Sequence, residues 1–573
     1  MNDQPKSIWN REILPEAGIF RWPGRFRRSF FTRRNLRRMV ILLAWTATLV
    51  ALFYGEEHWR GRRAWTQYRQ ELERRGEQLD LKAFIPKPVP DEQNFAATPF
   101  IRSWFERMTN SGDQWKDDFA QADKLVLNQK LDESRRHFVD LTAWAAAFDA
   151  VHSAKAEPAD QKTAFGARYG LGLKKGEVVP TRPESRQKLS SIDLDLETRS
   201  QAAPAVLEGL KSSEAVLAEL RAASARPASR FPVNYNMDNP WAILLPHLAQ
   251  LKGVCRRLDL RACAELAAGQ SAQALDDLTL MLYVADSVKG EPFLISYLVR
   301  LSCLKIATRT VWEGLAEHRW TDSQLKVLQD RLTGYNLLSD LKQPLATERA
   351  AAILTVDLLT RGKYNLNDLG DFNQQPETGS ALPILTKIIP SGWFYLERLN
   401  YCLSFDSLLN GTMDSATQRI WPDRVESNLR EFERQLFGGR FGRRWNMLAG
   451  HRIITALLLP ALGNVTHKTA NAQTTVNQAI IACALERYRL VNGNFPEKLE
   501  AIMPQFVSSL PHDVINGEPF HYRRGEGNQV TLYSVGWNLH DQSARKSLFE
   551  GKEGDWVWEY PQKASNPKAK PLE

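Results

Sequence analysis

The sequence predicts a mainly α-helical protein with a single transmembrane helix near one end and a small α+β module at the other. Three observations lead to this fold class: an uncharged apolar run of membrane length, a long middle region with apolar residues at helical spacing, and a closing region of β-prone runs. A chain of 573 residues also exceeds what one hydrophobic core normally serves, so we expect several folding units.

The apolar run extends from Met39 to Gly55. As a helix its 17 residues would rise about 25 Å, at the short end of what spans a bilayer. Eight arginines and no acidic residue occupy positions 21–38, directly before the run. Because such basic flanks stay in the cytoplasm, we expect a single-pass inner-membrane protein with a cytoplasmic N-terminus and a periplasmic C-terminal bulk. Phe53, Tyr54 and Trp59 would then lie at the membrane interface.

Other interpretations of the run stay open. A cleaved signal peptide fits poorly, because the leading tail is long and no small-x-small site follows. The stretch "TRRNLRR" at 32–38 resembles part of a twin-arginine export signal, but Arg37 stands where that motif has an apolar residue. A buried core helix would not explain the acid-free arginines. We therefore favour an uncleaved signal anchor.

The net charge of +9 comes almost entirely from the eight arginines of the tail. We interpret the tail as a topology determinant that touches anionic lipid, and we expect no nucleic-acid partner. The five cysteines are scattered singly through apolar helical patterns, which favours buried free thiols.

The middle of the chain predicts stacked helical hairpins. Two long amphipathic helices meet at Gly269, and "AELAAGQSAQALDDL" resembles a tetratricopeptide hairpin, with Gly269 in the turn and Ala274 at the close helix crossing. Such stacks usually present side chains to a partner. The expected division of the chain is a basic cytoplasmic tail (1–38), a transmembrane helix (39–55), a charged helix and proline-rich linker (56–94), an irregular helical region (95–240), a helical-hairpin domain (241–468) and an α+β module (469–573).

No motif in the sequence identifies a catalytic residue, a cofactor, a metal or a small-molecule substrate. His247, Cys255 and Cys263 recur every eight residues, but on a helix that spacing drifts by about 80° per step, so the three share no face. We interpret the G-x-G-x-x-x-G pattern of Gly170, Gly172 and Gly176 as a turn. The acidic residues Asp193, Asp195 and Glu197 alternate with apolar residues, which we interpret as a half-exposed strand or turn.

The closing region predicts one helix laid on a small antiparallel sheet. The helix of "ALERYRLVNGNFPEKL" ends at Gly493, where a left-handed residue is expected. "PFHYRR" and "NQVTLYSVG" form a hairpin around "GEG", and "GDWVWEYP" supplies a third strand. We expect a fragment that begins near Val465 to fold alone.

The order "ALERYRLVNGNFPEKLEAIMP … LPHDVINGEPFHYRR … YSVGWN" resembles the C-terminal domain of the major pseudopilin of type II secretion. The overall layout is similar to that of uncharacterised single-pass bacterial envelope proteins. This module lies more than 400 residues beyond the apolar run, so incorporation into a pseudopilus by the usual route is not expected. The resemblance also implies a calcium site, but Asn538 stands where the family has an aspartate; Asp541 and Asp555 remain as oxygen donors for a weak site.

Our leading hypothesis is a non-catalytic, membrane-anchored scaffold or interaction protein of the bacterial envelope, associated with a secretion-type assembly. Its terminal module either caps the helical stack or docks onto that assembly. The alternative is a membrane-tethered hydrolase acting on envelope polymers. A cleft with convergent carboxylates, or a serine and a histidine within hydrogen-bond reach, would favour the hydrolase. A broad apolar groove along the stack would favour the scaffold.

Overall fold

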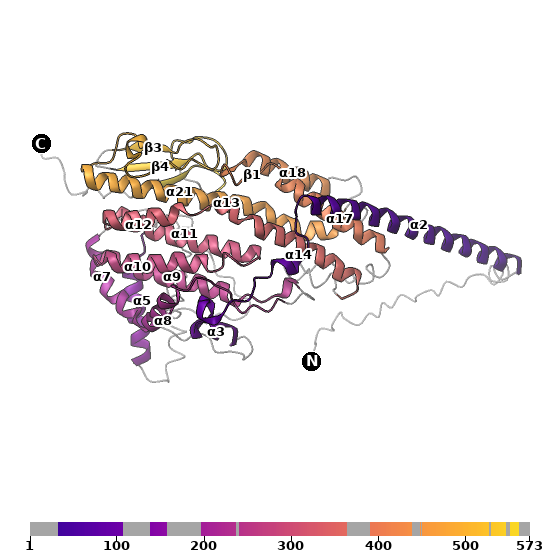
Figure 1. Cartoon of the computed structure of the whole chain (residues 1–573), viewed down its shortest axis with the longest axis horizontal. Coiled ribbons are helices and arrows are strands. Elements are labelled where there is room, and N and C mark those ends of the chain that lie inside the picture. Colours follow the sequence, from indigo (N-terminus) through magenta and orange to yellow (C-terminus); the bar gives the residue numbers. More distant parts are fainter. Residues whose placement is uncertain are drawn as a thin grey trace, which may run out of the picture.

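The computed structural model describes residues 33–106, 138–156, 196–235, 240–363, 390–437, 447, 450–525, 529–545 and 551–560. Within these residues the chain is mainly helical, with one candidate membrane helix near the N-terminus and a helix beside a three-stranded antiparallel sheet near the C-terminus (Figure 1). The predicted fold class is therefore confirmed.

The candidate membrane helix is α2 (Arg33–Arg74), which projects from the body over about half of its length (Figure 1). It is long and apolar enough to cross a membrane, and none of its most apolar window is buried. This excludes a core helix as the interpretation of the apolar run. The same helix continues past Gly55 without a break and buries Glu57, Gly61, Trp65 and Leu72 against the body. The charged segment after the run is thus part of the body and not a free stalk.

The proline-rich linker also lies on the body. Leu81, the first residue of η1 (Leu81–Phe84), packs against Ala350 and Ala351, and after η1 the carbonyl of Pro86 accepts a 3.0 Å bond from the Arg230 Nε. Two further short turns, η2 (Asp91–Gln93) and η3 (Phe95–Ala97), follow the linker.

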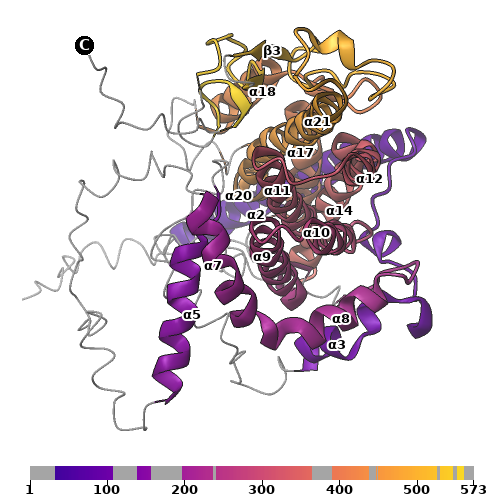
Figure 2. The ribbon, with the colours of Figure 1, turned by 90° about the vertical axis from the view of Figure 1, so that its left-hand side faces the viewer.

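The irregular helical region contributes α3 (Pro99–Glu106), α5 (Leu141–Ala156), α7 (Leu196–Gly209), η7 (Lys211–Ser213) and α8 (Glu214–Ala223). Helices α5 and α7 pack on each other at one edge of the body (Figure 2). Leu141, Trp144, Phe148 and Val151 share one face of α5, and all four side chains are buried in one cluster.

The middle of the body is the predicted helical stack. Its elements are η8 (Pro240–Ala242), α9 (Pro246–Ala267), α10 (Ser271–Asp286), α11 (Leu294–Ala316), α12 (Asp322–Thr333), α13 (Leu337–Asp340), α14 (Lys342–Thr360) and α17 (Ser391–Leu409). Gly269 joins α9 to α10 with φ +77°, as the hairpin turn requires, and Ala274 is fully buried. Thr321 caps α12 in a capping box with Gln324.

The last part of the chain begins with a short hairpin of β1 (Met413–Asp414) and β2 (Arg419–Ile420), followed by α18 (Pro422–Phe437), α20 (Ile453–Leu458) and η10 (Leu459–Leu462). Helix α21 (Gly463–Asn492) then ends at Gly493, whose φ of +79° confirms the predicted left-handed end. After η11 (Leu499–Ile502), the strands β3 (His521–Arg524), β4 (Val530–Ser534) and β5 (Trp556–Glu559) pair antiparallel in the order β3-β4-β5.

Helix α21 lies between this sheet and the helical stack, so its residues from Val465 to Glu486 are buried on most sides (Figure 1). Two hydrogen bonds also join the stack directly to the C-terminal region: the Trp312 Nε1 of α11 donates to Glu559 O over 2.8 Å, and the Gln329 Nε2 of α12 donates to Phe506 O over 2.7 Å. The boundary placed at residue 469 falls inside α21. Because the sheet and the stack share one core, we now expect a fragment that begins near Val465 not to fold alone.

Candidate functional site

The seam between α2 and α17 joins the candidate membrane helix to the body. At Gly61 and Gly392 the two backbones come so close that a Cβ on Gly392 would lie 2.4 Å from the backbone of Glu57. Only glycine permits this approach. One turn earlier, the His58 Nδ1 lies 2.8 Å from the Ser391 Oγ.

Glu57 places a carboxylate in this seam with its side chain only 5% exposed. It pairs with Arg60 on its own helix, and its Oε1 lies 2.8 Å from the Nε2 of His451, a residue that adopts φ +53°. Burial lowers the pKa of His451, and the neighbouring carboxylate offsets part of that effect. Glu57 therefore ties α2 to the segment that carries His451, at the point where α2 enters the body.

Further along the seam, polar and charged side chains also join α2 to the body. The Tyr68 hydroxyl donates to Asp406 over 2.6 Å, and the same carboxyl group lies 3.2 Å from Arg349, which also pairs with Glu77. Arg398 lies over Trp65 and pairs with Asp357 on α14 over 2.9 Å. The contacts between α2 and the stack thus extend over four helical turns.

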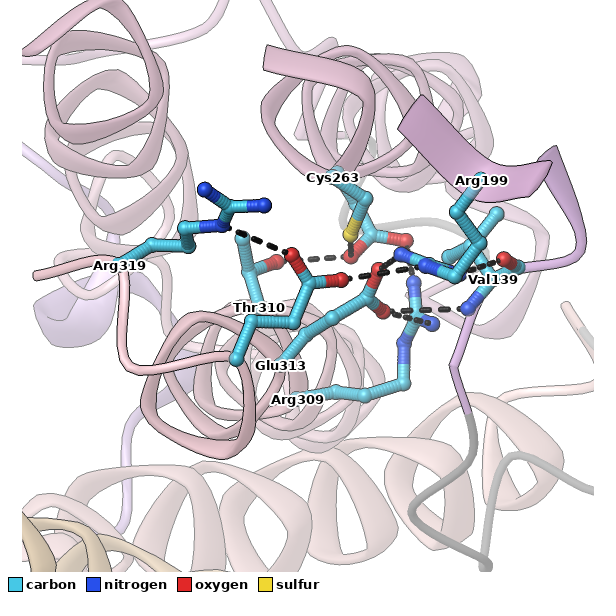
Figure 3. A network of polar contacts seen from close by, with 9 residues as sticks. Val139, Arg199, Cys263, Arg309, Thr310, Glu313 and Arg319 are labelled. Carbon is cyan, nitrogen blue, oxygen red and sulfur yellow. Dashed lines mark hydrogen bonds and ion pairs between the residues drawn. The ribbon is translucent and has the colours of Figure 1, made fainter. Parts of the chain in front are cut away.

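A buried charged cluster lies where α7, α9 and α11 meet (Figure 3). Arg199 binds Glu313 and the carbonyl of Val139, and it lies 3.1 Å from Glu317. Arg309 pairs with Asp259, which also accepts a 2.7 Å bond from Thr310, and Arg319 pairs with Glu317 over 3.4 Å. Three guanidinium groups thus face three carboxylates, so the cluster is balanced in charge.

Cys263 lies beside the cluster with its Sγ 3.8 Å from the Asp259 Oδ1 (Figure 3). Burial, followed by the nearby carboxylates Glu313 and Asp259, raises the pKa of this thiol well above its ordinary value. A thiol that stays protonated is a poor nucleophile and metal ligand. The cluster therefore attaches the α5–α7 pair to the stack and offers no reactive group to a substrate.

A second cluster, between α8, α9 and α10, carries an excess of negative charge. The Arg261 Nε lies 3.0 Å from Glu265 and 3.3 Å from Asp277, while Arg221 pairs with Asp277 over 2.6 Å and Glu214 with Arg261 over 2.8 Å. Burial and then Asp277 raise the pKa of Glu265 to about 8. Because these two carboxyl groups titrate as a pair, they retain a proton near neutral pH. They converge as a hydrolase would require, but both are buried.

The three residues that recur every eight positions along α9, His247, Cys255 and Cys263, do not form one site. His247 is fully buried between the rings of Phe105 and Phe231, and its Nε2 lies 2.7 Å from the Glu291 Oε1. Cys255 and Cys263, like the other three cysteines, are buried free thiols, as predicted. Among the described residues, no group of three or more histidine, cysteine or acidic side chains is placed to hold a metal ion.

The residues implicated by the pseudopilin resemblance serve local turns. Asp555 accepts backbone N–H bonds from Gln542 over 3.3 Å and from Ala544 over 2.7 Å. Asp541 accepts from the backbone of Ser543, and Asn538 accepts from that of His540. The carboxylate of Asp555 thus holds the backbone of residues 542–544 in place. The residues Gly170, Gly172, Gly176, Asp193 and Asp195 lie outside the described ranges, and Glu197 lies exposed in the first turn of α7.

A surface groove of about 630 Å³ lies between α12, α21 and the loop at 504–512. Both cationic side chains among its described lining residues are paired: Lys326 with Asp330 over 2.5 Å and Arg487 with Asp322 over 2.8 Å. Its wall is mixed polar and apolar, so it is not the broad apolar groove that would mark a docking site along the stack. Its lining residues include Gln329, Thr333, Asn477, Ile480, Val507 and His512.

Sequence reasoning found none of these contacts, because their partners lie up to 394 positions apart in the chain. The sequence does contain the two glycines of the seam, Gly61 and Gly392, but a glycine within a helix does not reveal which other helix it contacts.

This chain matches no family model, no curated protein and no solved structure.

Proposed function

We propose that this chain is a single-pass inner-membrane protein whose helical body lies in the periplasm and serves as a scaffold or interaction protein of the bacterial envelope, without a catalytic role. The observation that carries this proposal is the continuity of α2. Its exposed apolar half and its body-packed half are one helix, and the first buried residue, Glu57, follows Gly55 by two positions.

That continuity supports a scaffold because it removes any flexible spacer. Two residues of helix correspond to about 3 Å, so the body begins where the apolar run ends. A body held at one height and one orientation presents a constant face to partners in the same membrane. The pseudopilin-like order of the C-terminal region supports a partner from a secretion-type assembly.

The buried polar clusters also support a non-catalytic role, because their carboxylates and guanidinium groups pair with one another in the core. One observation favours the hydrolase alternative, namely the contact between His58 and Ser391. Among the described residues, no carboxylate is recorded within bonding distance of His58, so the orienting acid of a catalytic triad is missing there.

The membrane location is tested by alkaline carbonate washing and by reporters fused after Asn10 and after Glu573. We expect the chain to stay with the membrane and the C-terminal reporter to be active only in the periplasm. A C-terminal reporter that is active only in the cytoplasm would reverse the topology, and release by carbonate would remove the anchor.

The scaffold role is tested by photo-crosslinking in cells, with the crosslinking residue at exposed positions of the body such as Val327 on α12 and Leu403 on α17. We expect defined adducts with envelope proteins at some of these positions, and adducts at none of them would contradict the scaffold role. Ser391→Ala should leave both the adducts and the growth of the cells unchanged. If Ser391→Ala abolishes function while the adducts persist, the hydrolase alternative is favoured.

A further inference from the structure

Six arginines lie in the twenty residues after the apolar run, and their ion pairs divide them into two sets. Four pair with glutamates three or four positions away, which accounts for Arg60, Arg69, Arg74 and Arg75. For Arg62 and Arg63, no ion pair is recorded within the described part of the chain. Of the six arginines that follow the run, only Arg60 lies nearer to it than these two.

The two arginines and Trp59 lie away from the body. Helix α2 turns about 100° per residue, so a face centred between Glu57 and Leu72 leaves Trp59 and Arg63 on the opposite side and Arg62 on a flank. The Trp59 side chain is 62% exposed, and the Arg63 guanidinium lies over its ring at 5.4 Å from the centroid. This is an exposed aromatic side chain with a cation held beside it.

The depth of this surface follows from the helix itself. Trp59 lies about 6 Å beyond Gly55, and Arg62 and Arg63 lie about 10 to 12 Å beyond it. The headgroup layer is about 5 to 8 Å thick on each side of the hydrocarbon, and arginine side chains extend toward it from further out. Because the apolar run is about 5 Å shorter than the hydrocarbon, hydrophobic mismatch draws these residues further in.

We propose that Trp59, Arg62 and Arg63 form a lipid-contact surface that binds the phosphate groups of anionic phospholipids in the leaflet on the side of the body. The inference rests on the proposed anchoring of α2. The occupant is lipid because a continuous helix fixes the three residues at headgroup depth and their charge complements that of phosphate. Since α2 is joined to α17 by close backbone contact, this surface sets the tilt of the whole body.

The test uses the full-length protein in nanodiscs of phosphatidylcholine with or without phosphatidylglycerol. The measurements are the thermal unfolding midpoint and the number of phosphatidylglycerol molecules retained in native mass spectrometry. We expect Arg62→Gln/Arg63→Gln to lose at least half of the midpoint shift that phosphatidylglycerol produces, with the basic tail supplying the rest. Arg62→Lys/Arg63→Lys should keep most of it, because lysine keeps the charge.

The matched control is Arg69→Gln/Arg74→Gln, which removes two exposed arginines about 20 to 28 Å beyond Gly55 on the same helix. It should keep the full shift. The inference is overturned if Arg62→Gln/Arg63→Gln and the wild-type protein shift equally, or if inorganic phosphate in phosphatidylcholine discs reproduces the shift. Retention of the chain after carbonate washing separates that outcome from a failure of the anchor.

Discussion

Replacing Gly392 by alanine tests whether the candidate membrane helix is rigidly joined to the body. The new Cβ would lie 2.4 Å from the carbonyl carbon and oxygen of Glu57 and from the amide nitrogen of His58. These are backbone atoms in the middle of a helix, so no side chain can move aside. Helix α2 as a whole must retreat.

The size of the effect follows from that distance. Carbon atoms pack at about 3.5 to 4.0 Å, so the seam must open by roughly 1 Å. Overpacking of this kind typically costs about 1 to 3 kcal/mol. The same substitution at Gly253 in α9, where a new Cβ meets nothing within 4 Å, should instead stabilise the helix by up to about 1 kcal/mol. We therefore expect the two variants to differ by about 1 to 4 kcal/mol.

The assay is thermal unfolding of the full-length protein in detergent, together with the distance distribution between spin labels at Thr66 and Leu403. The native cysteines are buried, so labels attach to the introduced ones. We expect a lower midpoint and a longer or broader distance for Gly392→Ala, and no change in distance for Gly253→Ala.

The reciprocal change, Gly61→Ala, would bring a Cβ to 2.5 Å from the carbonyl oxygen of Gly392. Once the seam has opened for one alanine, the second costs little, so the double variant should lose clearly less than the sum of the two single losses. Equal midpoints for Gly392→Ala and Gly253→Ala, with unchanged distances, would refute the close approach and with it the rigid joint.

Three further predictions concern the rest of the body. Burial raises the pKa of Glu265, so between about pH 5 and 8 the folded state binds more protons than the unfolded state. The free energy of unfolding should therefore fall as the pH rises through this range, by up to about 1 kcal/mol per pH unit. Glu265→Gln should flatten that slope in unfolding midpoints measured across pH, and an unchanged slope would contradict the raised pKa. Gly493→Val should lower the free energy of unfolding by about 1 to 3 kcal/mol through backbone strain alone, because a Cβ there meets nothing within 4 Å. The control is Gly525→Val, which should cost less because Gly525 has no positive φ. Equal losses of stability in chemical denaturation would count against the left-handed helix end. A fragment from Gly463 to the C-terminus should show no cooperative melt by circular dichroism, since it exposes the face of α21 that packs on α11 and α12, and a sharp transition would show that the module is independent.

Local chemistry determined much of what could be predicted from the sequence. The turn at Gly269, the helix end at Gly493 and the β3–β4 hairpin each depend on residues close together in the chain, and the apolar run is one continuous segment. Propensity, capping and alternation are read from such neighbours, so these elements could be predicted without the tertiary structure.

The tertiary structure alone decided how the elements combine. It made the apolar run and the charged segment after it one helix bound to α17, and it placed α21 between the sheet and the stack, so that the expected boundary at residue 469 falls within a shared core. It also paired Glu57 with His451 and Arg199 with Glu313 across long stretches of sequence. The physical reason is that burial and ion pairing depend on which surfaces meet. The apolar and charged pattern of one helix is compatible with many partner surfaces, and only the packing of the whole chain selects among them.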